Sequence, residues 1–351
     1  MIKAEEIVPV REVHRLDGNR LAEYLQQSLE GFSGELTIRQ FGYGQSNPTY
    51  LLSAAGKEYV LRKKPPGKLL PSAHAVDREF RVIKAMRIAG VPVPKPFLLC
   101  EDETVIGTAF YVMERVKGRI FRDPTASAAR DARERALIFD AMNETLAKIH
   151  LVDWKATGLS EFGKPGNYMA RQVSRWTRQY EAAKTEPIES MDLLIRWLNE
   201  NLPGDEMTTV VHGDFRLENM IVHPSEPSIL AVLDWELSTL GHPLADLAYN
   251  CMGYHLPFTG EKGSGYLGLN LKELGLPSEA DYLAAYCRRT GRETIPDWDF
   301  FIAFSMFRLV AIVQGVYKRG LDGIASSDQA KTYGIFARYL AETAWHAVAS
   351  K

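Results

Sequence analysis

Short runs in which apolar and polar residues alternate dominate the first third of the chain. Three such runs, rich in β-branched or aromatic residues, lie at 35–41, 48–54 and 57–63. Two more follow at 96–101 and 108–115, after a helix that opens at Ser72 and ends before Gly90. Alternation with period two is typical of half-buried strands. The pattern therefore predicts five strands of an antiparallel sheet, with a helix inserted after the third.

An amphipathic helix is expected before these strands. Asp17 is a suitable N-cap for a helix that ends near Gly31. Leucines recur four residues apart on one face, at Leu21, Leu25 and Leu29. Because such an apolar stripe needs an apolar partner surface, we expect the helix to pack outside the sheet.

Helical periodicity dominates the chain beyond Gly118. Seven segments follow it: 127–150, 168–183, 190–201, 245–252, 279–289, 298–317 and 328–349. Short apolar runs at 220–222 and 229–233 predict the only strands in this part of the sequence. This change predicts an α+β protein with two lobes. The N-terminal lobe should span 1–116 and hold the five-stranded antiparallel sheet, and the C-terminal lobe, 117–351, should be mainly helical.

Length, composition and cysteine content exclude several classes of protein. A chain of 351 residues exceeds one ordinary core, so a cleft between two lobes is expected. The formal net charge of -2 argues against a nucleic-acid partner. The N-terminus is polar and no stretch reaches the about 20 apolar residues of a membrane span, so we expect a cytoplasmic protein. Cys100, Cys251 and Cys287 form no CxxC pair, which argues against disulfides or zinc.

The strongest chemical signal is VVHGDFRLENMIV at 210–222, in which a sharp loop joins two apolar runs. Such a loop can aim polar side chains into a cleft. Asp214 would orient a substrate hydroxyl and accept its proton, while Asn219 would reach the metal and phosphates from the loop's far end. We group His212 with them in the predicted catalytic centre. For HGD alone, an ordinary turn with a structural histidine is the alternative.

A second motif, AVLDWE at 231–236, favours the catalytic reading. Its apolar run ends in two carboxylates, which suit a hard cation such as Mg²⁺. Asp234 is the first predicted ligand, with Asn219 beside it and Glu236 as a helper or second-metal ligand. A solvent-facing strand end is the alternative. Asp246 is expected to bond buried backbone near the HGD loop rather than to act in catalysis.

These motifs together resemble a known superfamily. HGDxxxxN, then LDWE, then PLxDLA is similar to the aminoglycoside phosphotransferases and choline kinases, which are relatives of protein kinases. The resemblance runs from about Gly42 to the last helices. More narrowly, GQSNPTY, YVLRKKPPGK and VLDWELS resemble the kinase-like domain associated with acyl-CoA dehydrogenases. This implies a bilobal protein-kinase-like fold, the cofactors ATP and Mg²⁺, and a functional link to an acyl-CoA dehydrogenase.

The resemblance also implies a glycine-rich loop over the ATP phosphates. Its backbone amides, together with Ser46 and Asn47, would contact phosphate oxygens. The loop would be built on Gly42 and Gly44. A plain hairpin turn is the alternative reading of these glycines.

Arg62 departs from the family pattern, because the resemblance implies a phosphate-binding lysine at its position on the third strand. Arginine keeps the charge but differs from lysine in reach and hydration. Lys63 should point to the opposite face of a regular strand. Glu79, on the next helix, is the expected partner of Arg62. The alternative for Glu79 is a surface pair with a neighbouring basic residue.

The adenine pocket implied by the resemblance lies at YVMERVKG, 111–118. Met113 would form its back, and Glu114 and Val116 would offer backbone hydrogen bonds to the base. Val60 and Ile221 would sandwich the ring. Ordinary core packing accounts equally well for the apolar members of this set.

The acceptor site should lie over Asp214. Segments expected there supply mostly basic and aromatic residues: Arg171, Arg175, Trp176, Tyr180, Arg308, Tyr317, Lys318 and Arg319. This mixture favours an anionic or amphiphilic acceptor, although each residue can equally belong to a solvated helix face. By resemblance, the acceptor is a hydroxyacyl-CoA.

The predicted function is transfer of the ATP γ-phosphate to the hydroxyl of a small molecule. A choline- or sugar-type kinase is one alternative. A catalytically weak pseudokinase is another, because of Arg62. Protein-kinase activity is less expected, since no DFG or APE segment bounds an activation loop.

Overall fold

The computed structural model describes residues 7–42, 47–65, 75–204, 207–260, 265–323 and 332–349. The chain divides into two compact units. The first unit comprises 1–122, 126–162 and 216–238, and the second comprises 123–125, 163–215 and 239–351. These units are defined by compactness, whereas the boundary between 116 and 117 was predicted from a change of secondary structure. That boundary stays a prediction.

The first unit contains a six-stranded sheet with the order β1-β2-β3-β4-β6-β5. Its strands are β1 (Ile7–Val8), β2 (Thr37–Phe41), β3 (Thr49–Ala54), β4 (Lys57–Lys63), β5 (Pro96–Cys100) and β6 (Phe110–Glu114). All neighbouring strands are antiparallel. The five predicted strands are confirmed. The sequence missed β1, because two residues are too few to show alternation.

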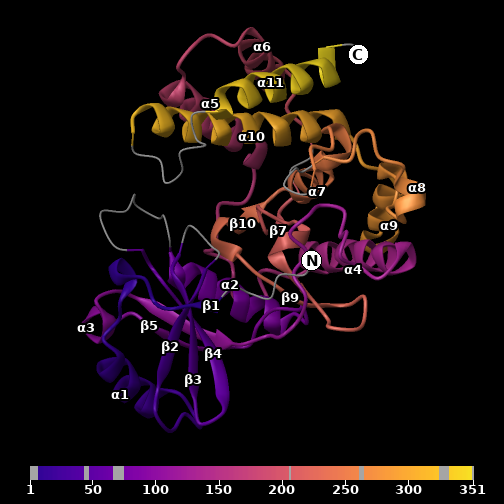
Figure 1. Cartoon of the computed structure of the whole chain (residues 1–351). Coiled ribbons are helices and arrows are strands. Elements are labelled where there is room, and N and C mark those ends of the chain that lie inside the picture. Colours follow the sequence, from indigo (N-terminus) through magenta and orange to yellow (C-terminus); the bar gives the residue numbers. More distant parts are fainter. Residues whose placement is uncertain are drawn as a thin grey trace. The chain divides into compact units, whose positions relative to one another are not determined.

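One face of this sheet is covered by α1 (Gly18–Ser28) and α3 (Glu103–Ile106) (Figure 1). Leu21 and Leu25 of α1 are fully buried in the same core cluster as Leu52 and Leu61 of the sheet. Asp17 caps α1 by accepting a hydrogen bond from the Arg20 N–H at 3.1 Å. The predicted helix outside the sheet is therefore confirmed.

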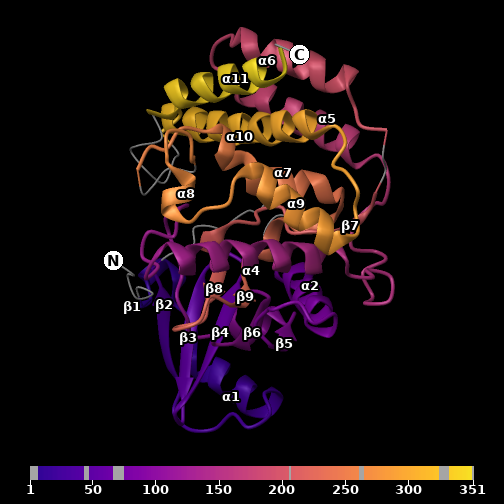
Figure 2. The same ribbon diagram turned by 90° about the vertical axis from the view of Figure 1, so that its right-hand side faces the viewer.

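Further elements of the first unit complete the surroundings of the site. Helix α2 (Val76–Ile88) packs against β5 and β6, and α4 (Ala132–His150) packs against β9. Strands β8 (Met220–Val222) and β9 (Ile229–Val232) form a hairpin, flanked by the 3-10 helices η2 (Leu217–Asn219) and η3 (Trp235–Leu237); Figure 2 shows α4 beside it. The predicted start of α2 at Ser72 lies outside the described residues.

Gly118 lies directly against this hairpin. A Cβ atom at Gly118 would come within 2.4 Å of both the Ile221 Cγ2 and the Val222 carbonyl oxygen, so no side chain fits. The next residue, Arg119, exchanges backbone hydrogen bonds with Val222 at 2.7 and 2.8 Å. The chain that leaves β6 is thus fixed to the hairpin.

The second unit is mainly helical. Its helices are α5 (Tyr168–Ala183), α6 (Glu189–Glu200), α7 (Pro243–Cys251), α8 (Leu271–Leu274), α9 (Glu279–Thr290), α10 (Trp298–Leu321) and α11 (Tyr333–Ala349). Figure 2 shows α10 and α11 side by side, and α10 also contacts α5, α6 and α7. A short antiparallel pair, β7 (Thr209–Val211) with β10 (Thr239–Gly241), carries the HGD loop.

Helix α10 qualifies the expectation that no apolar stretch has the length of a membrane span. By length and composition it could cross a membrane, with a mean hydropathy of 1.8 over 18 residues. Yet 67% of that window is buried inside the structure. Phe301, Phe304 and Phe307 are among its buried side chains. Such burial is typical of a core helix, which is hydrophobic on all sides for the same reason.

Candidate active site

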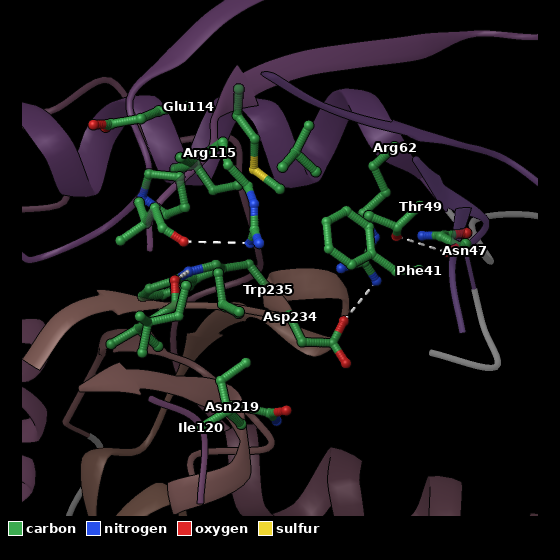
Figure 3. A pocket seen from close by; sticks show the side chains of 18 of the residues that line it. Phe41, Asn47, Thr49, Arg62, Glu114, Arg115, Ile120, Asn219, Asp234 and Trp235 are labelled. Carbon is green, nitrogen blue, oxygen red and sulfur yellow. Dashed lines mark hydrogen bonds and ion pairs between the residues drawn. The ribbon is translucent and has the colours of Figure 1, made fainter. Parts of the chain in front are cut away.

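The first unit holds a pocket of about 1080 Å³ of empty space, part of it open to solvent (Figure 3). The pocket lies between the sheet face that α1 leaves uncovered and the β8–β9 hairpin. Its lining is Phe41, Asn47, Thr49, Val60, Arg62, Ile83, Pro94, Tyr111, Met113, Glu114, Arg115, Val116, Ile120, Arg122, Glu218, Asn219, Ile221, Val232, Leu233, Asp234 and Trp235. Residues from distant parts of the sequence thus share one cavity.

Part of the lining is apolar, and it contains the four apolar residues among the five predicted for the adenine pocket. Val60 of β4 and Met113 of β6 come from the sheet, Val116 follows β6, and Ile221 belongs to β8. The structure also adds Phe41 at the end of β2, which the sequence did not single out. The Arg115 guanidinium lies 5.2 Å from the centre of the Phe41 ring. A flat hydrophobic ligand such as a nucleobase suits this surface.

The backbone of the segment predicted to bind adenine, 111–118, forms some of its hydrogen bonds within the protein. The Glu114 N–H donates to the Lys95 carbonyl at 2.8 Å, and the Glu114 carboxylate accepts from the Lys95 N–H at 3.0 Å. The Val116 carbonyl accepts a long hydrogen bond of 3.4 Å from the Arg115 side chain (Figure 3). A base at this position would therefore have to use groups other than the Glu114 N–H.

Arg62 is the centre of the polar part of the pocket. Its Nη2 lies 2.6 Å from Asp234 Oδ1 (Figure 3). The same atom lies 3.6 Å from Glu236 Oε2. Its Nε lies 3.2 Å from Glu79 Oε2, so the predicted pair between β4 and α2 is present. One guanidinium thus joins three carboxylates from two segments of the first unit, α2 and the start of η3.

Two further donors hold the Glu79 carboxylate. The Tyr111 hydroxyl donates to Oε2 at 2.9 Å, and the Asn47 amide donates to Oε1 at 2.7 Å. Asn47 lines the pocket and donates its amide to Glu79, and its predicted contact with phosphate stays a prediction. Tyr111 was not predicted at all, although it lies two residues before Met113 and hence on the same face of β6.

Burial and the neighbouring charges shift the pKa values of this cluster in opposite directions. Burial alone would lower the pKa of Arg62, but the nearby carboxylates of Glu79 and Asp234 outweigh it and raise that pKa. Burial raises the pKa of Glu79, with Arg62 and the Tyr111 hydroxyl opposing the change. Burial also raises the pKa of Tyr111, so its hydroxyl stays a proton donor. Arg62 is therefore a permanent cation in this pocket.

Asp234 and Asn219 form the part of the lining that can bind a metal ion. Asp234 has the left-handed conformation, φ 65°, that non-glycine residues rarely adopt and that often marks functional sites. The Leu233 N–H donates to the Asn219 carbonyl at 2.8 Å, which ties the two segments together. Within the described ranges, no group of three or more His, Cys, Asp or Glu residues is arranged to hold a metal.

The predicted metal site fits Mg²⁺ by its donor chemistry. Asp234 offers a carboxylate with a third of its side chain exposed, and Asn219 offers an amide oxygen in the same lining. Both are the hard oxygen donors that Mg²⁺ prefers. Formally, one guanidinium faces the three carboxylates of Glu79, Asp234 and Glu236. A divalent cation would balance the remaining two negative charges. Glu236 contacts Arg62 but does not line the pocket.

The HGD loop belongs to the second unit, where Asp246 of α7 holds it. The N–H groups of His212 and Gly213 donate to the Asp246 carboxylate at 2.6 and 2.8 Å. The predicted structural role of Asp246 is confirmed. Gly213 has φ 84°, a conformation that favours glycine. His212 is fully buried and its Nδ1 accepts from the Asp214 N–H at 3.2 Å, so its ring supports the loop.

The surroundings of Asp214 are aromatic and basic. The Tyr249 hydroxyl, which the sequence did not single out, donates to Asp214 Oδ1 at 2.7 Å. Arg308 donates to the Gly213 carbonyl at 2.7 Å, and its guanidinium lies 5.4 Å from the Trp176 ring and 4.9 Å from the Tyr249 ring. Arg175 faces the same indole at 5.6 Å. Three of the predicted acceptor-site residues are thus brought together.

Other residues predicted for the acceptor site have partners of their own. Arg171 donates to the carbonyls of Lys164 and Gly166, and Lys318 pairs with Asp322. Tyr180 is fully buried.

The predicted phosphate loop is described only in part. Gly44 and Ser46 lie outside the described residues. Gly42 is described and does not line the pocket.

Comparison with known proteins gives a consistent result. A model of the phosphotransferase enzyme family matches residues 37–300. The chain is 49% identical over 338 residues to acyl-CoA dehydrogenase family member 10 of Mus musculus. That match covers 96% of this chain but 32% of the relative, so the chain spans about a third of that protein's length.

Solved structures show the same fold. The crystal structure of a putative aminoglycoside phosphotransferase from Ralstonia eutropha has a TM-score of 0.88 at 47% identity, covering 96% of this chain and 99% of that one. A thermostable mutant of aminoglycoside phosphotransferase APH(4)-Ia, in ternary complex with ADP and hygromycin B, has a TM-score of 0.60 at 15% identity, over 94% and 99% of the two chains. The second likeness concerns the fold alone.

Proposed function

We propose that this chain, which belongs to the phosphotransferase enzyme family, uses ATP and Mg²⁺ to phosphorylate a hydroxyl group of a small molecule. The observation that carries the proposal is the pocket of the first unit. It combines an apolar surface for a base with a permanent cation, Arg62, and two oxygen donors, Asn219 and Asp234. A structure of an aminoglycoside phosphotransferase with this fold contains ADP, which supports a nucleotide as the ligand.

The proposed reaction divides the work among few residues. The γ-phosphorus leaves the oxygen that links it to ADP and bonds to the substrate hydroxyl, whose proton passes to Asp214. Arg62 binds phosphate oxygens, and Asn219 and Asp234 hold the metal. Bound Mg²⁺ supplies neutralisation of the phosphate charge. Tyr249 orients Asp214 by its 2.7 Å hydrogen bond.

The proposed acceptor is an anionic or amphiphilic alcohol, with a hydroxyacyl-CoA as the first candidate. Arg308, Arg175 and Trp176 gather near Asp214, and positive charge there suits an anion rather than a polycationic aminoglycoside. The matched relative is named an acyl-CoA dehydrogenase family member, which supports a link to acyl-CoA metabolism. A choline- or sugar-type kinase and a pseudokinase remain the alternatives.

Replacement of the proposed base tests the function. Asp214→Asn keeps the size of the side chain and an acceptor oxygen for Tyr249, but removes the base. With hydroxyacyl-CoA as acceptor and labelled ATP as donor, we expect turnover to fall by roughly 2–4 decades. ATP affinity, measured by calorimetry, should change little. Equal turnover in the variant would contradict the role of Asp214, and no turnover by wild type on any acceptor in a metabolite screen would favour the pseudokinase.

A further inference from the structure

The guanidinium of Arg62 contacts Asp234, the residue that the proposed function assigns to the metal ion. Arg62 Nη2 lies 2.6 Å from Asp234 Oδ1 and 3.6 Å from Glu236 Oε2. At these distances the guanidinium already neutralises the carboxylate assigned to Mg²⁺. A second cation that approaches Asp234 must compete with it.

The two ends of the Arg62 guanidinium have different surroundings. Nε lies 3.2 Å from Glu79, which is 1% exposed and is held by Tyr111 and Asn47 as well. Nη2 points to Asp234, which is 34% exposed and lines the pocket. The Nε end is therefore anchored in the core. Only the Nη2 end can exchange Asp234 for another anion without breaking a fully buried network.

We propose that, because of Arg62, the pocket binds a divalent cation together with a nucleoside polyphosphate in preference to the same cation alone. A free cation has to displace the guanidinium from Asp234 and leaves Nη2 with only the more distant Glu236 carboxylate, 3.6 Å away. A metal–nucleotide complex brings phosphate oxygens that accept from Nη2, so the displaced hydrogen bond is replaced. Tyr111 and Asn47 are positioning residues in this exchange because they fix Glu79. The inference rests on the proposed function and assigns Arg62 a role in selecting the form of the cofactor.

Binding of free Mn²⁺, followed by electron paramagnetic resonance without nucleotide, tests this selectivity. Arg62→Gln removes the competing cation, so we expect Mn²⁺ alone to bind about tenfold tighter or more than to wild type, the scale of one charge-assisted hydrogen bond. The same variant should bind ATP more weakly in the presence of Mn²⁺. Lys63→Gln is the matched control: it removes an equal charge from the next position of β4, on the other face, and should change the Mn²⁺ affinity less than about twofold.

Each outcome bears on one of the two proposals. Unchanged or weaker Mn²⁺ binding by Arg62→Gln overturns the proposal that Arg62 competes with the free cation for Asp234. So does an equal gain in Lys63→Gln, because the effect would then be one of net charge. If Arg62→Gln does not fold, Arg62→Lys decides. Its ammonium is a point charge and cannot reproduce the guanidinium fork that joins Glu79 to Asp234. Mn²⁺ alone should therefore bind tighter than to wild type, and an equal affinity overturns the inference. The proposed metal site itself fails only if Asp234→Ala leaves Mn²⁺-dependent ATP binding intact.

Discussion

Two adjacent cations on β4, Arg62 and Lys63, have opposite environments. Arg62 points into the pocket and lies within 3.6 Å of three carboxylates. Lys63 points to the face covered by α1, is 6% exposed, and has the Tyr50 ring 6.0 Å from its Nζ. Among the described residues no ion pair reaches Lys63. Carboxylates raise the pKa of Arg62 against burial, whereas burial lowers the pKa of Lys63.

The contrast shows how one strand separates chemistry from stability. Successive side chains of a strand point to opposite faces, so a shift of one residue moves a charge from the pocket to the core. On the pocket face, a buried charge is retained with partners suited to phosphate and metal binding. On the core face, the charge of Lys63 has no ion pair within the part of the chain that the structure describes, and it is expected to reduce stability. Variants on the pocket face should therefore change nucleotide and metal binding, whereas variants on the core face should change stability.

The largest effect is expected at Asp234. Asp234→Ala removes the proposed metal ligand and one partner of Arg62, and we expect Mg²⁺-dependent ATP binding to disappear from calorimetric titrations. Loss of an outer-shell partner costs about 10–100-fold in metal sites, so a direct ligand should cost more. Glu236→Ala should weaken binding only in part. Glu58→Ala is the control, since it also removes a paired carboxylate, bound to Lys117 at 2.6 Å, but lies outside the lining.

An intermediate effect is expected at Tyr111. Tyr111→Phe keeps the ring and removes the hydroxyl that donates to Glu79, so Arg62 is held less firmly. We expect the KM for ATP to rise about 2- to 10-fold with a smaller change in kcat, the range of one net hydrogen bond.

The control on the other face of the sheet is Tyr50→Phe. The Tyr50 hydroxyl donates to the His14 carbonyl at 2.7 Å, away from the pocket. Its loss should lower the melting temperature and leave the KM for ATP unchanged. Equal KM changes in the two variants would mean that Tyr111 acts through general stability and not through Glu79.

Local patterns predicted the strands and the opposite directions of Arg62 and Lys63, because both follow from a short period. The pair between Arg62 and Glu79 was implied by the family resemblance, and the structure contains it. Arg62 and Asp234 are 172 positions apart, and no local pattern reports which of several carboxylates meets a given cation. The hydrogen bonds of Tyr111 and Asn47 to Glu79 were missed for the same reason. The roles assigned to Asp214, Asn219 and Asp234 stay predictions.

The smallest effect is expected at Lys63, and it concerns stability alone. Burial lowers the pKa of Lys63, so the folded protein holds the proton less tightly than the unfolded chain. The cost of the buried charge is therefore complete below the folded pKa and disappears as the pH rises toward the unfolded value of about 10.4. We expect Lys63→Met to raise the melting temperature by about 2 °C near pH 7, the shift for a change below about 1 kcal/mol in a chain of this size. The gain should shrink as the pH approaches 10, and the KM for ATP should stay at the wild-type value. A higher KM in Lys63→Met would place Lys63, and not Arg62, at the nucleotide.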